Sequence, residues 1–301
     1  MPANSDIHSP DSREHNEPRL DTGKISGTGM KCWYWLPVAI FWLLLWQILY
    51  WAVRQDILLA SPLQVLLSLF HLFRQSSFWI AVLFSLLRIE TGFFLGLLFG
   101  TGLAVLTSKF VWVSRFIYPA ISAIRSTPIA SFIILVLFWM SSSRVVIFIV
   151  FLMVMPIVWT NVTEGIRKID PNLLEMSAVF HLTRRQILQH INIPSVSPFF
   201  VASATTSLGL AWKAGIAAEV LSTPKSSLGG LLYNSKIYLE TPELLAYTAV
   251  IILLSLLLEK IMVRVLKNSS QYFQQRGRIN IPKNMSDMSE GRNESSTGGQ
   301  V

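Results

Sequence analysis

Residues 144–163 read RVVIFIVFLMVMPIVWTNVT, and Arg144 at the first position is the only charged residue among them. The hydrocarbon core of a bilayer is about 30 Å thick, so a helix needs roughly 20 apolar residues to cross it. This run has the required length and composition. It therefore predicts a transmembrane helix.

Five further apolar runs extend this pattern along the chain, near residues 35–53, 79–107, 116–139, 196–221 and 244–266. Together the runs predict an all-α fold, a polytopic integral membrane helical bundle with about six transmembrane helices. Five crossings are the alternative, because the second run is over-long and carries Arg88 and Glu90 in its first half. In that case the first half lies along the membrane interface or against other helices.

The composition excludes other classes of protein. Of the 301 residues, 52% are apolar and 14% are charged, whereas an average soluble protein carries about 25% charged residues. The 10 Trp and 18 Phe exclude a chain that is disordered throughout. The single cysteine, Cys32, excludes an internal disulfide and a Cys-rich metal site.

The two ends of the chain are polar, and basic residues indicate their side of the membrane. Residues 1–31 and 269–301 predict disordered tails that flank a membrane domain over 32–268. With the N-terminus inside, the inner segments carry fifteen Lys and Arg and the outer segments five. Both tails are therefore predicted in the cytoplasm. The same asymmetry accounts for the net charge of +8. The lipid bilayer is therefore the expected partner of these basic residues, and nucleic acid is not expected as a partner.

The loop over 164–195 is the only substantial inner segment between apolar runs. Asp170 and Pro171 predict the start of a short helix, whose apolar face carries Leu174, Ala178 and Val179. Thr183 is a candidate cap of a second helix, which Pro194 is expected to end. This helix pair is either a docking surface for another protein or an amphipathic segment on lipid. Spacing alone leaves both interpretations open.

The same loop resembles the EAA motif of bacterial ABC importer permeases, which runs E-A-A, three residues, G, nine residues and I-x-L-P. Here the corresponding residues are Glu175-Met176-Ser177, His181 and Ile191-Asn192-Ile193-Pro194, and every interval agrees. Other short elements over roughly 59–266 resemble the nitrate, sulfonate, taurine and bicarbonate branch of that family. They are Ser61-Pro62, Ser85, Arg88, Gly92-Phe93, Pro119, Pro128, Pro156, Asn161, Gly165, Trp212, Ala218-Glu219 and Leu228-Gly229.

The resemblance implies a type I ABC importer permease, a multi-pass protein of the bacterial plasma membrane. Its implied partners are two copies of an ATPase subunit, an extracytoplasmic solute-binding protein and a second permease copy in a homodimer. The residues that it implies for coupling to the ATPase are Leu174, Glu175, Met176, Ser177, Ala178, Val179, His181, Ile191, Ile193 and Pro194. No G-x-x-x-x-G-K-[ST] occurs in the chain, so no cofactor is expected here and ATP is hydrolysed by the partner.

Polar residues inside the apolar runs are the candidates for a solute path, because a charge at membrane depth needs a partner or a water-filled cavity. Arg125 and Lys213 would give a positive lining suited to an anion. Alternatively, Lys213 pairs with Glu219 and Arg88 with Glu90 inside helix contacts. The full candidate path is Arg125, Pro128, Trp212, Lys213 and Glu219.

Gly92, Gly96 and Gly100 recur at intervals of four residues, a pattern that lets two helices approach closely. We expect these glycines to serve helix packing, with a flexible gate as the alternative.

Two other classes of protein stay as alternatives, an integral-membrane enzyme and an ATP-independent channel. The enzyme is disfavoured because the five histidines are scattered and form no catalytic or metal-binding constellation.

Overall fold

The computed structural model describes residues 31–55 and 57–277, so most of the tails predicted over 1–31 and 269–301 lies outside these residues. All regular elements of the described part are helices. They are α1 (Lys31–Val53), α2 (Pro62–Arg74), α3 (Ser76–Lys109), α4 (Val111–Ser126), α5 (Ile129–Leu137), α6 (Ser142–Arg167), α7 (Pro171–Val179), α8 (Arg184–Ile187), the π-helical turn η1 (Leu188–Asn192), α9 (Ile193–Ser222), α10 (Leu228–Ile237) and α11 (Thr241–Gly277). The all-α prediction is confirmed.

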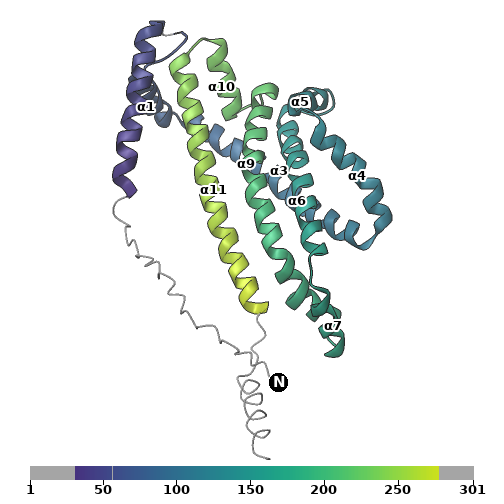
Figure 1. Cartoon of the computed structure of the whole chain (residues 1–301). Helices are drawn as coiled ribbons and strands as arrows, with labels where there is room; N and C mark the ends of the chain where they lie inside the picture. Colours follow the sequence, from purple (N-terminus) through teal and green to yellow (C-terminus); the bar gives the residue numbers. More distant parts are fainter. Residues whose placement is uncertain (1–30, 56, 278–301) are drawn as a thin grey trace, which may run out of the picture. The chain divides into compact units, whose positions relative to one another are not determined.

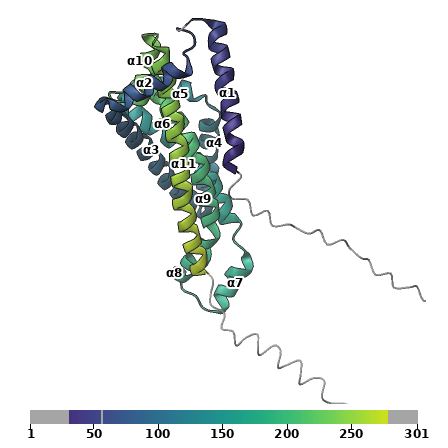
Figure 2. The ribbon, with the colours of Figure 1, turned by 90° about the vertical axis from the view of Figure 1, so that its left-hand side faces the viewer.

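The chain divides between Ile48 and Leu49 into two units, and the second holds every helix from α2 onward. In this second unit α6 is the central helix, packed against α3 and against α9, while α11 lies along α9 (Figures 1 and 2). The buried side chains of α6 form most of the seam with its neighbours. Among them Val146, Val150, Val154 and Val158 are fully covered.

Three described helices are long and apolar enough to cross a membrane: α3, α6 and the part of α11 from Thr241 to Val265. A fourth crossing results if α4 and α5 together form one span. The apolar part of α1, Pro37–Val53, is shorter, and α9 has the length but not the apolar composition. The predicted number of about six crossings therefore stays a prediction.

The apolar run over 116–139 does not form one straight helix. The helix breaks at Thr127 and Pro128, where α4 and α5 meet at a bend of 101°. Both residues are extended, with ψ of 133° and 132°. The ring of a proline disfavours helical backbone in the residue before it, so Pro128 forces Thr127 out of the helix.

Pro194 does not end a helix, which corrects a second expectation. The chain runs from α8 through η1 into α9 without leaving helical backbone. The π-turn changes the hydrogen-bond register just before Pro194, since the Ile193 N–H bonds the Leu188 carbonyl. Pro194 therefore falls in the first turn of a new α-helix, where a missing N–H costs little.

The start of the predicted C-terminal tail is helical, which corrects a third expectation. Helix α11 continues to Gly277, so residues 269–277 are helical and not disordered. Adding a residue to an existing helix requires no new nucleation, and 266–277 contain no proline. The polar composition of this segment therefore indicates where the apolar span ends and does not mark the end of the helix.

Candidate coupling surface and translocation path

The helix–turn–helix segment over α7 and α8 forms as its local sequence predicts. The Asp170 side chain accepts a hydrogen bond from the Asn172 N–H at 2.9 Å, and Pro171 occupies the first turn of α7. Thr183 caps α8 in a reciprocal capping box with Gln186. Both predicted helix starts are confirmed.

The turn between α7 and α8 has left-handed backbone at the position where the motif has glycine. His181 has a φ of 50°. The Leu182 N–H bonds the Ser177 carbonyl at 3.0 Å and the His181 N–H bonds the Ala178 carbonyl at 3.1 Å. This pair of bonds is the Schellman motif, which usually places glycine at the left-handed residue. His181 therefore adopts the turn that glycine favours, at a cost in backbone strain.

The outer surface of α7 is apolar, and no other described part of the chain covers it. Val179 is 75% exposed and Phe180 68% exposed, and Leu174 and Met176 are also exposed. The Glu175 carboxylate lies on the same exposed helix, whereas Ser177 is buried and donates to the Leu174 carbonyl. Exposed apolar side chains of this kind mark an interaction site.

The second half of the predicted coupling set lies on the connection to α9. Ala178 and His181 are exposed, Ile191 is buried, Ile193 is exposed and Pro194 is half-buried. The two halves of the motif therefore lie on two segments, the exposed helix α7 and the helical stretch of η1 and the start of α9, which the turn over 180–183 and α8 join (Figure 2). A displacement of α7 would pass through the turn over 180–183 to α8, from which helical backbone continues through η1 into α9.

Arg125 lies at the last turn of α4, just before the bend. Its guanidinium donates to the Thr160 hydroxyl of α6 at 3.3 Å, and its side chain is otherwise exposed. Two cavities of about 330 Å³ each border Arg125. One is lined by Tyr118 and Trp159, and the other reaches Leu210 of α9.

The other candidate path residues on α9 face different ways. Lys213 is exposed and lies one turn beyond Leu210, whereas Trp212 is buried and its indole N–H donates to the Ile251 carbonyl of α11 at 3.1 Å. Pro128 is exposed at the start of α5. The structure thus places Arg125, Pro128 and Lys213 on accessible surface and Trp212 in a helix contact.

Glu219 is completely buried and joins three helices. It forms an ion pair with Arg88 of α3 at 3.3 Å. Its Oε2 accepts from the Ser85 hydroxyl at 2.7 Å and from the Gly229 N–H of α10 at 3.1 Å. The Ser85 hydroxyl in turn accepts from the Leu228 N–H at 2.9 Å. A buried carboxylate with this many donors has the compensation that its desolvation requires.

Arg88 extends the same network to the loop between α9 and α10. Its guanidinium donates to the carbonyls of Lys225 at 2.7 Å and Ser226 at 3.1 Å. Thr223 and Ser226 in this loop have positive φ values of 40° and 50°. Such strained residues persist only where neighbouring contacts hold them, and Arg88 provides two of those contacts.

The two charge pairs expected from the sequence are wrong. Arg88 pairs with Glu219, and neither Lys213–Glu219 nor Arg88–Glu90 forms an ion pair. Lys213 does not pair with Glu219 because Lys213 lies on the exposed side of α9, whereas Glu219 lies on its buried side. Sequence reasoning therefore missed the cluster of Ser85, Arg88 and Gly229 around Glu219. The available signal was that a lone cation on one apolar run and a lone carboxylate on another each need a partner.

The three ridge glycines lie where α3 and α6 approach each other. A Cβ at Gly92, Gly96 or Gly100 would come within 3.0 Å of the side chain of Val150, Val154 or Val158, respectively. Backbone-to-side-chain contact this close requires glycine.

No group of three or more possible metal ligands occurs among the residues that the structure describes.

Comparison with known proteins places this geometry in a family. The family described as "Binding-protein-dependent transport system inner membrane component" matches residues 92–271. The putative aliphatic sulfonates transport permease protein SsuC of Escherichia coli (strain K12) is 30% identical over 43% of this chain and 49% of its own length. The taurine transport system permease protein TauC of the same strain is 23% identical over 71% of this chain and 80% of its own.

A third relative is the nitrate import permease protein NrtB of Synechococcus elongatus, which is 30% identical over 50% of this chain and 53% of its own length. The chain therefore spans about half the length of SsuC and of NrtB, and more of TauC. All three matched relatives carry permease names. The resemblance seen in the sequence is confirmed at the level of the family and its branch.

Proposed function

Since the chain belongs to the family of binding-protein-dependent transport system inner membrane components, we propose that it is the permease subunit of an ATP-driven importer. The observation that carries this proposal is the exposed apolar helix α7, which bears Glu175 and is joined by a short turn to the continuous helical path of α8, η1 and α9. A membrane protein with such a surface and no ATP-binding motif of its own needs an ATPase subunit to drive transport.

In the proposed mechanism, movement of α7 switches the helical bundle between two states. When a pair of ATPase subunits closes on ATP, the α7 helices of two permease copies are drawn together. Because α8, η1 and α9 form one helical path, this movement tips α9 relative to its neighbours. The bundle then alternates between an inward-facing and an outward-facing arrangement around the solute path.

The orientation and the partners follow from the same proposal. The excess of Lys and Arg on the tails and on the segment that contains α7 supports a cytoplasmic position for α7 and for both termini. The opposite end, with the loop between α9 and α10, then receives solute from an extracytoplasmic binding protein. Two copies of this chain and two ATPase subunits make up the assembly, and the chain itself is a transport component without catalytic residues.

The solute is a small anion. Arg125 is exposed between two cavities, Lys213 is exposed on α9, and neither forms an ion pair within the described residues. Unpaired cations at membrane depth are costly unless they face water or a mobile counter-ion. The matched relatives are named for sulfonates, taurine and nitrate, and each of these solutes carries a negative group.

Co-purification of the ATPase subunit tests the proposal. The full chain, purified in mild detergent with its co-expressed ATPase, should retain it, and Glu175→Ala and Val179→Asp should reduce retention about tenfold because both alter the exposed helix. The control is Gln189→Ala, an exposed polar residue outside α7. Equal retention by all variants, or solute movement into vesicles without ATP, would favour the channel alternative instead.

A further inference from the structure

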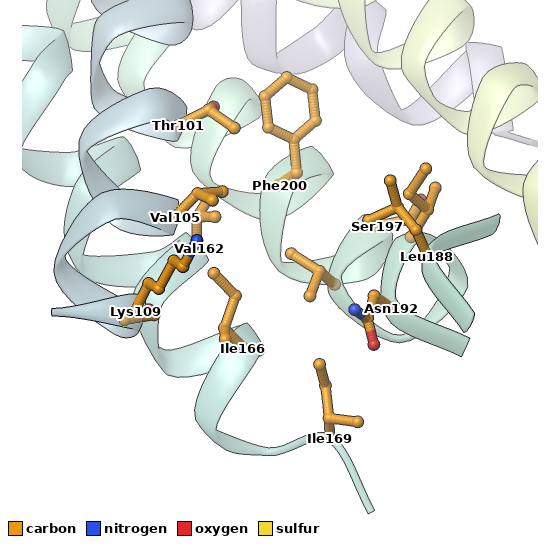
Figure 3. A pocket seen from close by; sticks show the side chains of 13 residues that line it. Thr101, Val105, Lys109, Val162, Ile166, Ile169, Leu188, Asn192, Ser197 and Phe200 are labelled. Atoms are coloured by element: carbon orange, nitrogen blue, oxygen red, sulfur yellow. The ribbon is translucent and has the colours of Figure 1, made fainter. Parts of the chain in front are cut away.

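A cavity of about 470 Å³ lies at the α7 end of the second unit, beside η1. Its walls come from the last turns of α3 and α6 and from the first turns of α9 (Figure 3). Most of the lining is apolar and includes Val105, Ile166, Ile169 and Val196. The proposed function does not use this cavity, since Arg125 and Lys213 line other surfaces.

The rim of this cavity is polar and positively charged. Lys109 stands on one wall and Asn192 on the opposite wall, as Figure 3 shows. Within the described residues Lys109 forms no ion pair, and its ammonium lies 5.4 Å from the centre of the Phe110 ring. The Asn192 Oδ1 is buried and has no hydrogen-bond partner. Because this oxygen is buried, it is not accessible from the cavity, and Lys109 is the charged group on the rim that an occupant can contact.

The cavity continues as an apolar groove along α3. A second, mostly apolar cavity, of about 760 Å³, is lined by Leu98 and Glu90 of α3 and by Leu258 and Ile261 of α11. Thr101 and Phe200 line both cavities, so the two are contiguous. From Lys109 to Phe94 the groove follows α3 for about 22 Å at a rise of 1.5 Å per residue, which is similar to the length of an extended acyl chain.

The chemistry of this site matches a phospholipid better than a small anion. A free anion would use Lys109 but would gain nothing from the long apolar groove, whose burial is favourable only for hydrocarbon. A phosphodiester supplies the negative charge for Lys109. The position of the rim at the α7 end corresponds to the cytoplasmic leaflet.

We propose that this groove binds one anionic glycerophospholipid, such as phosphatidylglycerol. The phosphate lies at Lys109, and one acyl chain lies between α3 and α11. The bound lipid then packs under η1, the turn that joins the α7–α8 segment to α9. Only the choice of leaflet rests on the proposed function; the groove and its lining do not.

Native mass spectrometry of the full chain in detergent tests this proposal. With added phosphatidylglycerol, the wild type should retain one lipid per chain, and phosphatidylcholine should be retained less. Lys109→Gln should weaken retention of phosphatidylglycerol about fivefold, the effect of one basic residue on an anionic lipid. Arg115→Gln is the matched control, because Arg115 also stands over an aromatic ring, that of Trp112, but does not line the cavity.

A second variant tests the groove without changing charge. Ser197→Phe fills the cavity and should abolish retention of both lipids, while size-exclusion and thermal melting show that the protein still folds. Equal retention by the wild type and Lys109→Gln would overturn the proposal. So would displacement of the lipid by millimolar inorganic phosphate, which indicates a site for a free anion. Absence of lipid from a stable dimer would also overturn it, because the second copy then fills the groove.

Discussion

At the scale of single residues, Glu219 and His181 show two kinds of departure from ordinary sequence rules. Glu219 is a fully buried carboxylate, and it is stable there because Arg88, Ser85 and the Gly229 N–H surround it. His181 has a left-handed backbone that L-residues disfavour by about 1–2 kcal/mol. Both residues lie at the ends of the path from α7 through α9 to the α10 loop, where strain and buried charge mark functional positions.

Removal of the Glu219 carboxylate tests the buried network. Glu219→Ala leaves Arg88 buried without its counter-charge, which typically costs about 3–5 kcal/mol. We expect a marked fall in the thermal midpoint of the purified protein, measured by the fluorescence of its tryptophans. Ser85→Ala removes one hydrogen bond and should cost about 1–3 kcal/mol, and Lys213→Met, on the exposed side of α9, should cost little. A midpoint for Glu219→Ala equal to that of Lys213→Met would contradict the network.

At the scale of elements, the close contact of α3 and α6 organises the second unit. The ridge of Gly92, Gly96 and Gly100 lets the two helices approach until the α6 valines contact the α3 backbone. On its other side α6 packs against α9. The close contact of α3 and α6 therefore also positions α9, the helix that carries Glu219. The broken pair of α4 and α5 lies beside this rigid core and places Arg125 at the bend. Packing of small residues replaces the hydrophobic effect as the source of stability between such helices.

A matched pair of glycine substitutions tests the seam. At Gly96 an added Cβ would lie 2.6 Å from the Val154 Cβ, so Gly96→Ala should separate the helices and lower the thermal midpoint by several degrees. At Gly102 of the same helix an added Cβ meets nothing within 4 Å. Gly102→Ala should therefore be neutral or stabilising, by up to about 1 kcal/mol from helix propensity. Equal effects of the two substitutions would show that α3 and α6 do not pack this way.

At the scale of the whole molecule, the distribution of charge and the position of α7 determine which side of the membrane each surface faces. The basic residues predict that α7 is cytoplasmic and that the end of α10 is extracytoplasmic. Both surfaces are exposed, since Met176 on α7 and Tyr238 after α10 are accessible. The function proposed for this chain requires them to lie on opposite sides.

Labelling of single cysteines in intact cells tests this arrangement. Cys32 is the only native cysteine, so a Cys32→Ser background accepts one new thiol at a time. A membrane-impermeant maleimide should label Tyr238→Cys and not Met176→Cys, and permeabilised cells should show labelling of both. Labelling of Met176→Cys in intact cells would invert the topology and exclude α7 as a contact for a cytoplasmic ATPase.

The amino-acid sequence by itself determined the helical membrane fold, the starts of α7 and α8 and the family. These features depend on local chemistry, namely long apolar runs, capping side chains and residues at fixed spacing, and local chemistry is visible in one dimension. Only the tertiary structure decided that Arg88 meets Glu219, that the helix bends by 101° at Pro128 and that helical backbone passes through Pro194. A buried charge selects its partner by distance in space, and a proline either breaks a helix or joins one according to the hydrogen-bond register before it.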